Sequence, residues 1–165
     1  MSGKYEHAPT ETVDVGGTSF VYRELGPRGG TPLVFLHHFT AVLDDWDPRV
    51  IDGIAAHRRV ITFDNRGIGA TDGKVPNTLD AMADDAAAFI RALGHEKVDL
   101  IGFSIGGGVA QEVTLANPEL VRRLILAGCG LLPRRLIGRV ARRLVLTRPR
   151  LRLVRPLRSA HRLSW

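Results

Sequence analysis

The segment Val98-Asp99-Leu100-Ile101-Gly102-Phe103-Ser104-Ile105-Gly106-Gly107 decides the fold of this 165-residue chain. Its first part is an apolar run typical of a buried strand, and residues 105–116 are compatible with a helix that ends at Asn117-Pro118. The pattern G-x-S-x-G therefore lies at a strand-to-helix turn, where a serine hydroxyl is raised above the end of a sheet. The neighbouring side chains must be small, and Gly102 and Gly106 meet that requirement.

The rest of residues 1–130 alternates between predicted strands and helices. Gly16-Gly17 separates two strand-like stretches, which predicts an antiparallel hairpin. Short apolar runs are typical of strands buried on both faces of a parallel sheet; they occupy 33–36, 60–63, 98–103 and 124–127. A helix is expected from Leu79 to Leu93, with Thr78 as its N-cap and Gly94 as its stop. This alternation predicts an α/β protein with a mostly parallel sheet.

Two loops that follow predicted strands carry further sequence motifs. His37-His38-Phe39 follows the apolar run at 33–36, and Asp64-Asn65-Arg66-Gly67-Ile68-Gly69-Ala70-Thr71 follows the run at 60–63. Together with the serine turn, these loops resemble the α/β-hydrolase superfamily, in its esterase, lipase and non-haem haloperoxidase-like group. The first loop is similar to the H-G-x oxyanion loop, and the second to the D-x-R-G-x-G-x-S/T loop. The resemblance covers roughly residues 11–130.

The resemblance implies a three-layer α/β-hydrolase fold, truncated after about the sixth strand and followed by a basic C-terminal tail. It implies that Ser104 is the nucleophile and that the backbone N–H groups of Phe39 and Ile105 hold the oxyanion. The expected partner is a small-molecule acyl substrate such as an ester, and no cofactor or metal is implied. His38 departs from the family pattern, because the family usually has glycine there.

The acid and the base of a serine hydrolase should follow the nucleophile in the chain. After Ser104 the only acidic residues are Glu112 and Glu119, and the only histidine is His161. None of them follows a predicted strand. His37 and His38 precede the serine, on the oxyanion side of the predicted site. We therefore expect the chain as given to be inactive or nearly so, because serine needs a base to accept its proton.

The charge divides the chain at residue 130. Residues 1–130 hold 17 acidic and 12 basic residues, a net charge of −5, whereas residues 131–165 hold 11 arginines and no acidic residue. Three interpretations of residues 131–165 stay open. The segment is out-of-frame sequence, or an incomplete cap of the hydrolase domain, or a basic amphipathic helix that binds an anionic membrane or nucleic acid. The helix is suggested by apolar residues at 136, 137, 140, 141 and 144.

Composition excludes several classes of protein. The chain is 44% hydrophobic and 24% charged, as globular proteins are, and Cys129 is its single cysteine. A disulfide framework and a multi-cysteine zinc site are thereby excluded. The first ten residues lack the pattern of a secretory signal, so a cytoplasmic location is expected. The acidic body, residues 1–130, is not expected to bind nucleic acid.

The third interpretation of the tail makes a prediction. If residues 131–165 carry a binding function, affinity for DNA or for anionic vesicles should fall steeply as salt is raised, because bound counterions are released. Deleting residues 131–165 should abolish the binding. Binding that survives the deletion would exclude the tail as the binding element.

Overall fold

The computed structural model describes residues 3–38 and 40–130. In these residues six strands form one sheet in the order β1-β2-β4-β3-β5-β6. The strands are β1 (Glu11–Val15), β2 (Thr18–Leu25), β3 (Leu33–Leu36), β4 (Val60–Phe63), β5 (Val98–Phe103) and β6 (Val121–Ala127). The pairs β1–β2 and β2–β4 are antiparallel, and β4, β3, β5 and β6 run parallel. The α/β fold class predicted from the sequence is confirmed.

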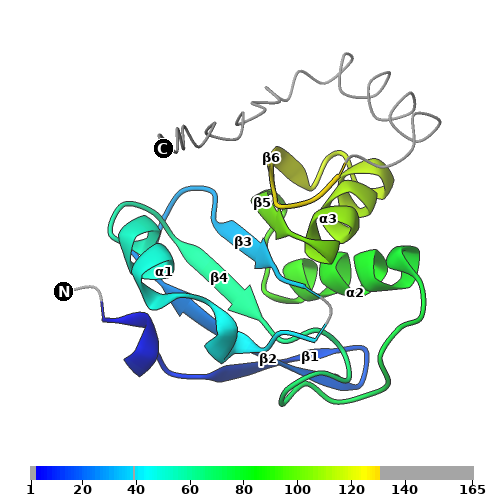
Figure 1. The fold of residues 1–165 in the computed structure, drawn as a ribbon, viewed down its shortest axis with the longest axis horizontal. Coiled ribbons are helices and arrows are strands. Elements are labelled where there is room, and N and C mark those ends of the chain that lie inside the picture. Colours follow the sequence, from blue (N-terminus) through cyan, green and yellow to red (C-terminus); the bar gives the residue numbers. More distant parts are fainter. Residues whose placement is uncertain (1–2, 39, 131–165) are drawn as a thin grey trace, which may run out of the picture.

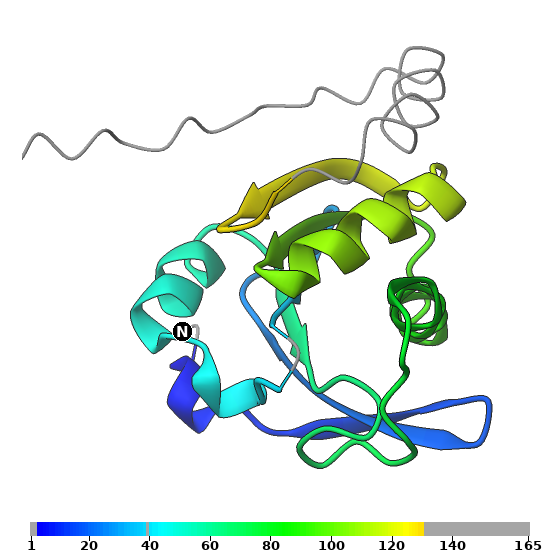
Figure 2. The same ribbon diagram turned by 45° about the vertical axis from the view of Figure 1, so that its right-hand side comes forward.

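Helices cover both faces of the sheet. Helix α1 (Pro48–Ala55) lies on one face, and α2 (Leu79–Ala92) and α3 (Ile105–Ala116) lie on the other (Figures 1 and 2). Two apolar clusters match these layers, one around α2 and α3 and one around α1. Both β3 and β4 are buried along their whole length, as their continuous apolar sequences predict. None of the helices in the described part of the chain is long and apolar enough to cross a membrane.

Most predicted boundaries agree with the structure, and the exceptions have physical causes. The Thr78 side chain accepts a hydrogen bond from the Ala81 N–H, so it is the N-cap of α2. Strand β6 begins at Val121, three residues before the apolar run, because Arg122 and Arg123 disguise its start. Helix α1 was not predicted, although Asp47 caps it and Pro48 occupies its first turn.

A buried carboxylate joins the strands at the N-terminal edge of the parallel sheet. Asp99 in β5 is 1% exposed and accepts hydrogen bonds from Arg58 at 2.8 Å and from Arg122 at 2.9 and 2.8 Å. Arg58 also donates to the carbonyl of Thr31, just before β3. Burial acts to raise the pKa of Asp99, but the two guanidinium groups outweigh it and hold the pKa below its ordinary value. Asp99 is therefore ionised at neutral pH and links β5, β6 and the turn after α1.

Replacing this carboxylate should destabilise the fold. We expect Asp99→Asn to lower the free energy of unfolding at pH 7 by about 3 kcal/mol, since it leaves two arginines without their partner. A depressed pKa contributes stability above the unfolded-state value, and that contribution disappears as the pH falls through the folded-state value. The difference in free energy of unfolding between the wild type and the variant should therefore shrink below about pH 4. Urea denaturation at pH 7 and pH 3 measures it.

The matched control is Asp84→Asn, on the exposed side of α2. It should change stability by about 0.5 kcal/mol or less at either pH. Equal effects of the two substitutions at pH 7 would contradict the role assigned to Asp99.

Candidate active site

Ser104 is the single residue between the end of β5 and the start of α3. Its backbone lies at φ 55° and ψ −121°, and among the described residues it is the only non-glycine with a positive φ. Such a conformation costs of order 1–3 kcal/mol and tends to occur at functional sites. The Ser104 N–H donates to the carbonyl of Ala127 at 3.0 Å, and the Ser104 carbonyl accepts from the Gly107 N–H at 3.0 Å. The residue is exposed at the C-terminal end of β5.

Two glycines give the turn the room that the sequence predicts. A Cβ at Gly102 would lie 2.4 Å from the carbonyl oxygen of Gly106. A Cβ at Gly106 would lie 2.2 Å from the carbonyl oxygen of Leu36 and 2.6 Å from that of His37. Real Cβ atoms do not approach backbone oxygens so closely. The start of α3 is therefore packed directly on the end of β3, where the predicted oxyanion loop begins.

The adjacency of β3 and β5 brings the two predicted donor segments to one edge of the sheet. Leu36 pairs with Gly102, so the loop after β3 lies next to the serine turn. The Ile105 N–H is at the first position of α3, where backbone donors have no partner within the helix and the helix dipole favours negative charge. Phe39, the other predicted donor, lies outside the described residues.

His38 is accommodated without left-handed strain. Because its φ is not positive, a side chain is tolerated where the family usually has glycine. The imidazole of His38 meets the ring of Phe103 edge-on, with 6.4 Å between centroids. Phe103 is itself 42% exposed and packs on Trp46 at 6.5 Å. The departure from the family pattern therefore adds an aromatic wall beside the serine turn.

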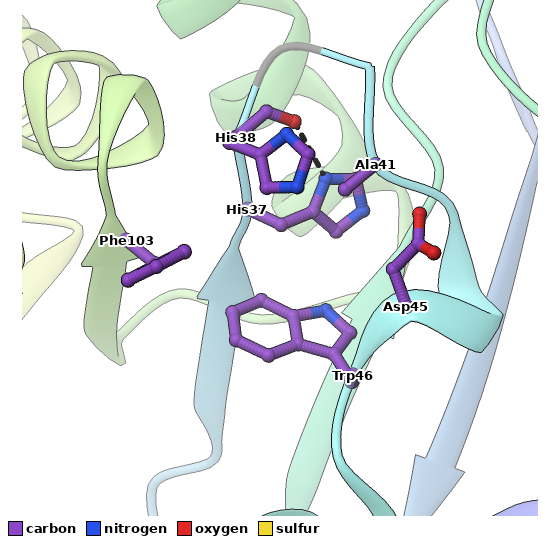
Figure 3. A pocket seen from close by; sticks show the side chains of 6 residues that line it. All are labelled: His37, His38, Ala41, Asp45, Trp46 and Phe103. Atoms are coloured by element: carbon purple, nitrogen blue, oxygen red, sulfur yellow. Dashed lines mark hydrogen bonds between the residues drawn. The ribbon is translucent and has the colours of Figure 1, made fainter.

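A pocket of about 90 Å³ lies beside the predicted oxyanion loop (Figure 3). It lies where the ends of β3 and β5 face η2 (Leu43–Asp45) and the residue after it, Trp46. Its lining residues are His37, His38, Ala41, Asp45, Trp46 and Phe103. Most of the wall is aromatic, and the Trp46 indole also packs on Phe35 at 5.0 Å. The pocket is therefore small, and its wall is mainly aromatic.

His37 belongs to the interior rather than to the reaction. Its side chain is 3% exposed, and its Nδ1 lies 3.3 Å from the carbonyl oxygen of His38, to which only a protonated Nδ1 could donate. Burial lowers the pKa of His37, so the ring is neutral at pH 7. Neither this histidine nor His38 makes a hydrogen bond to Ser104 among the described contacts. The structure does not bring a base to the serine from this side.

The loop after β4 begins at Asp64 and holds the segment around Leu43, which follows the predicted oxyanion loop. The buried carboxylate of Asp64 accepts from the Leu43 N–H at 2.7 Å and from the Ala70 N–H at 3.1 Å. Gly69, at φ 58°, lies against it so closely that a Cβ would meet Asp64 Oδ2 at 2.2 Å. Arg66 bonds Asp85 of α2 at 2.7 Å and so fixes the loop to the opposite layer. The motif that carried the family resemblance is therefore a support for the site.

Neither acidic residue after Ser104 is placed to assist it. Glu112 lies two turns along α3, and Glu119 follows the end of that helix, where it pairs with Arg91 at 3.3 Å. His161 lies outside the described residues. Within residues 3–38 and 40–130, no group of three His, Cys, Asp or Glu side chains is arranged to hold a metal ion.

The chain belongs to the α/β-hydrolase fold family, whose profile matches residues 31–152. It is similar to a non-heme chloroperoxidase of Streptomyces lividans, with 40% identity over 67% of this chain and 41% of that protein. It is also similar to a bifunctional esterase/perhydrolase of Acinetobacter calcoaceticus, with 35% identity over 67% of this chain and 41% of that protein. The chain therefore spans about two fifths of the length of these curated relatives.

Comparison with a solved structure also indicates the α/β-hydrolase fold. An α/β-hydrolase fold protein from Chitinophaga pinensis superposes with a TM-score of 0.74 and 40% sequence identity, over 75% of this chain and 45% of that one. The resemblance inferred from the three sequence motifs is confirmed at the level of the family and the fold.

The close packing of α3 on β3 can be tested within one helix. We expect Gly106→Ala to destabilise the protein by about 3 kcal/mol, because the new methyl group must displace backbone at Leu36. Gly108→Ala is the matched control, since its Cβ would meet only the flexible Leu79 side chain at 3.2 Å. That change should stay within about 1 kcal/mol, as alanine also favours helix. Thermal and urea unfolding measure both, and equal effects would contradict the packing argument.

Proposed function

We propose that this protein is a serine hydrolase that acts on esters or related small acyl substrates, with Ser104 as nucleophile. The observation that carries the proposal is the left-handed backbone of Ser104 at a strand-to-helix turn. That conformation is costly for a residue with a side chain, and here it presents a hydroxyl at the C-terminal edge of a parallel sheet. The family relationship supports hydrolase chemistry.

The proposed reaction begins with attack of the Ser104 Oγ on the substrate carbonyl carbon. The carbonyl oxygen becomes an oxyanion, which the N–H groups of Ile105 and Phe39 would hold, each worth on the order of 3 kcal/mol. The serine proton must pass to a base, and the leaving alkoxide must receive a proton. The contacts of His37 and Glu119 place neither of them for these transfers, and we infer that the acid and base come from outside residues 3–38 and 40–130.

The size of the pocket supports a short acyl group. The pocket has a volume of about 90 Å³ and is lined by residues that neighbour the serine turn rather than by Ser104 itself. Its walls include Trp46 and Phe103, which favour an apolar group. We therefore propose that the acyl group is short and apolar.

An ester assay tests the catalytic part of the proposal. The 165-residue chain should hydrolyse p-nitrophenyl acetate no faster than its Ser104→Ala variant, because loss of the base typically costs ~10⁶ in turnover. Enzyme-like hydrolysis that vanishes in Ser104→Ala would refute the expected inactivity, although it would support Ser104 as nucleophile.

A boronic acid tests the nucleophile without requiring turnover. Ethylboronic acid forms a bond from boron to the serine oxygen while the serine proton passes to the buffer, which gives a tetrahedral boronate that resembles the reaction intermediate without needing a protein base. We expect boron-11 NMR to detect this adduct with the wild-type chain and not with Ser104→Ala. The control Ser19→Ala, on β2, should retain it. Absence of a Ser104-dependent adduct would count against the proposed function.

A further inference from the structure

Leu43 connects the pocket wall to the rest of the molecule. It is the first residue of η2, and Asp45 and Trp46, which follow it closely, line the pocket. Leu43 is 4% exposed, so water does not compete for its backbone groups. Whatever fixes the backbone at Leu43 therefore fixes the wall that carries Trp46.

Both backbone polar groups of Leu43 are held by buried side chains distant in sequence. Its N–H donates to Asp64 Oδ1 at 2.7 Å, and its carbonyl accepts from the Tyr5 hydroxyl at 2.6 Å. Asp64 follows β4, whereas Tyr5 lies in η1 (Tyr5–His7), before the first strand. The N-terminal turn thus contacts the segment that carries the pocket wall.

Tyr5 is itself fixed from several sides. Its side chain is 1% exposed, and its hydroxyl lies 3.1 Å from Thr62 Oγ1 in β4. Its backbone N–H donates to Asp52 of α1 at 2.7 Å, in agreement with the position of η1 against α1 in Figure 2. The guanidinium of Arg23 lies over the ring, 5.3 Å from its centroid. Burial raises the pKa of Tyr5, so the hydroxyl stays protonated and able to donate at neutral pH.

We propose that Tyr5 is a positioning residue for the substrate pocket: its hydroxyl, together with the Asp64 carboxylate, fixes Leu43 and thereby the wall formed by Asp45 and Trp46. The inference rests on the proposed function only in naming the pocket as the substrate site. Tyr5 does not touch the substrate. It acts through Leu43, and its loss should open η2 locally.

Hydrogen exchange of the Leu43 amide measures this local opening. In Tyr5→Phe we expect the ratio of the exchange rate of the Leu43 amide to that of the Ile61 amide in β4 to rise about fivefold. The reason is that one hydrogen bond that opposes the opening is gone. Tyr22→Phe is the matched control, since within residues 3–38 and 40–130 its hydroxyl bonds Glu11 on the outer hairpin, at 2.9 Å, and not the segment around Leu43. It should leave the ratio of the two amides unchanged.

A result in which Leu43 and Ile61 accelerate equally, or not at all, would overturn the positioning role, because a purely structural residue changes global stability alone. If Tyr5→Phe does not fold, Asp52→Ala removes the anchor of the Tyr5 N–H instead. It should accelerate Leu43 over Ile61 in the same direction. Equal acceleration in that variant would also overturn the proposal.

Ligand binding separates this inference from the proposed function. The chain has two tryptophans, so in Trp165→Phe the emission of Trp46 reports on the pocket alone. Ethyl acetate should alter this emission, and Tyr5→Phe in that background should need about fivefold more of it for the same change. Equal affinity in the two proteins would overturn the positioning role. Absence of ethyl acetate binding with the exchange result intact would reject the small-acyl site while Tyr5 still fixes Leu43.

Discussion

The close approach of α3 to the ends of β3 and β5 is the constraint on which the site depends. It is achieved at Gly102 and Gly106, where no side chain separates the helix from the strands. The helix can then begin one residue after the strand ends, and Ser104 must adopt a left-handed backbone to make the turn. The hydrogen bond from its N–H to Ala127 in β6 helps to hold that conformation. Strain at one residue is offset by the packing around it.

The N-terminal and C-terminal ends of the parallel strands carry different structural features. At the N-terminal end, the buried carboxylate of Asp99 and two arginines connect β5 to its neighbours. At the C-terminal end, the serine turn and the loop after β3 meet beside a small aromatic pocket. This separation is general in α/β proteins, because the loops at the C-terminal ends of the strands converge on one surface. The N-terminal end thus carries an ion-pair network, whereas the C-terminal end carries the serine turn and the pocket.

The pocket wall is maintained by residues far from it in sequence. Asp64 and Tyr5 reach Leu43 from the loop after β4 and from the N-terminal turn. Two distant segments thus converge on the backbone of Leu43 and support the short 3₁₀ turn that precedes Trp46. A buried hydrogen bond in a region of low dielectric is costly to break, so the arrangement resists fluctuation.

The alternation of strands and helices, the serine turn and the family could be predicted from the amino-acid sequence, because these follow from local periodicity and from short motifs. The sequence also indicated which two glycines the turn needs. It did not indicate α1, whose signals were only Asp47 and Pro48, nor the pocket, nor the roles of Tyr5 and Asp64. The pocket and these roles depend on which distant segments meet. The hydrogen bond between Tyr5 and Leu43 produces no recognisable pattern in the sequence of either segment. Only the packing of the sheet against its helices decides such contacts.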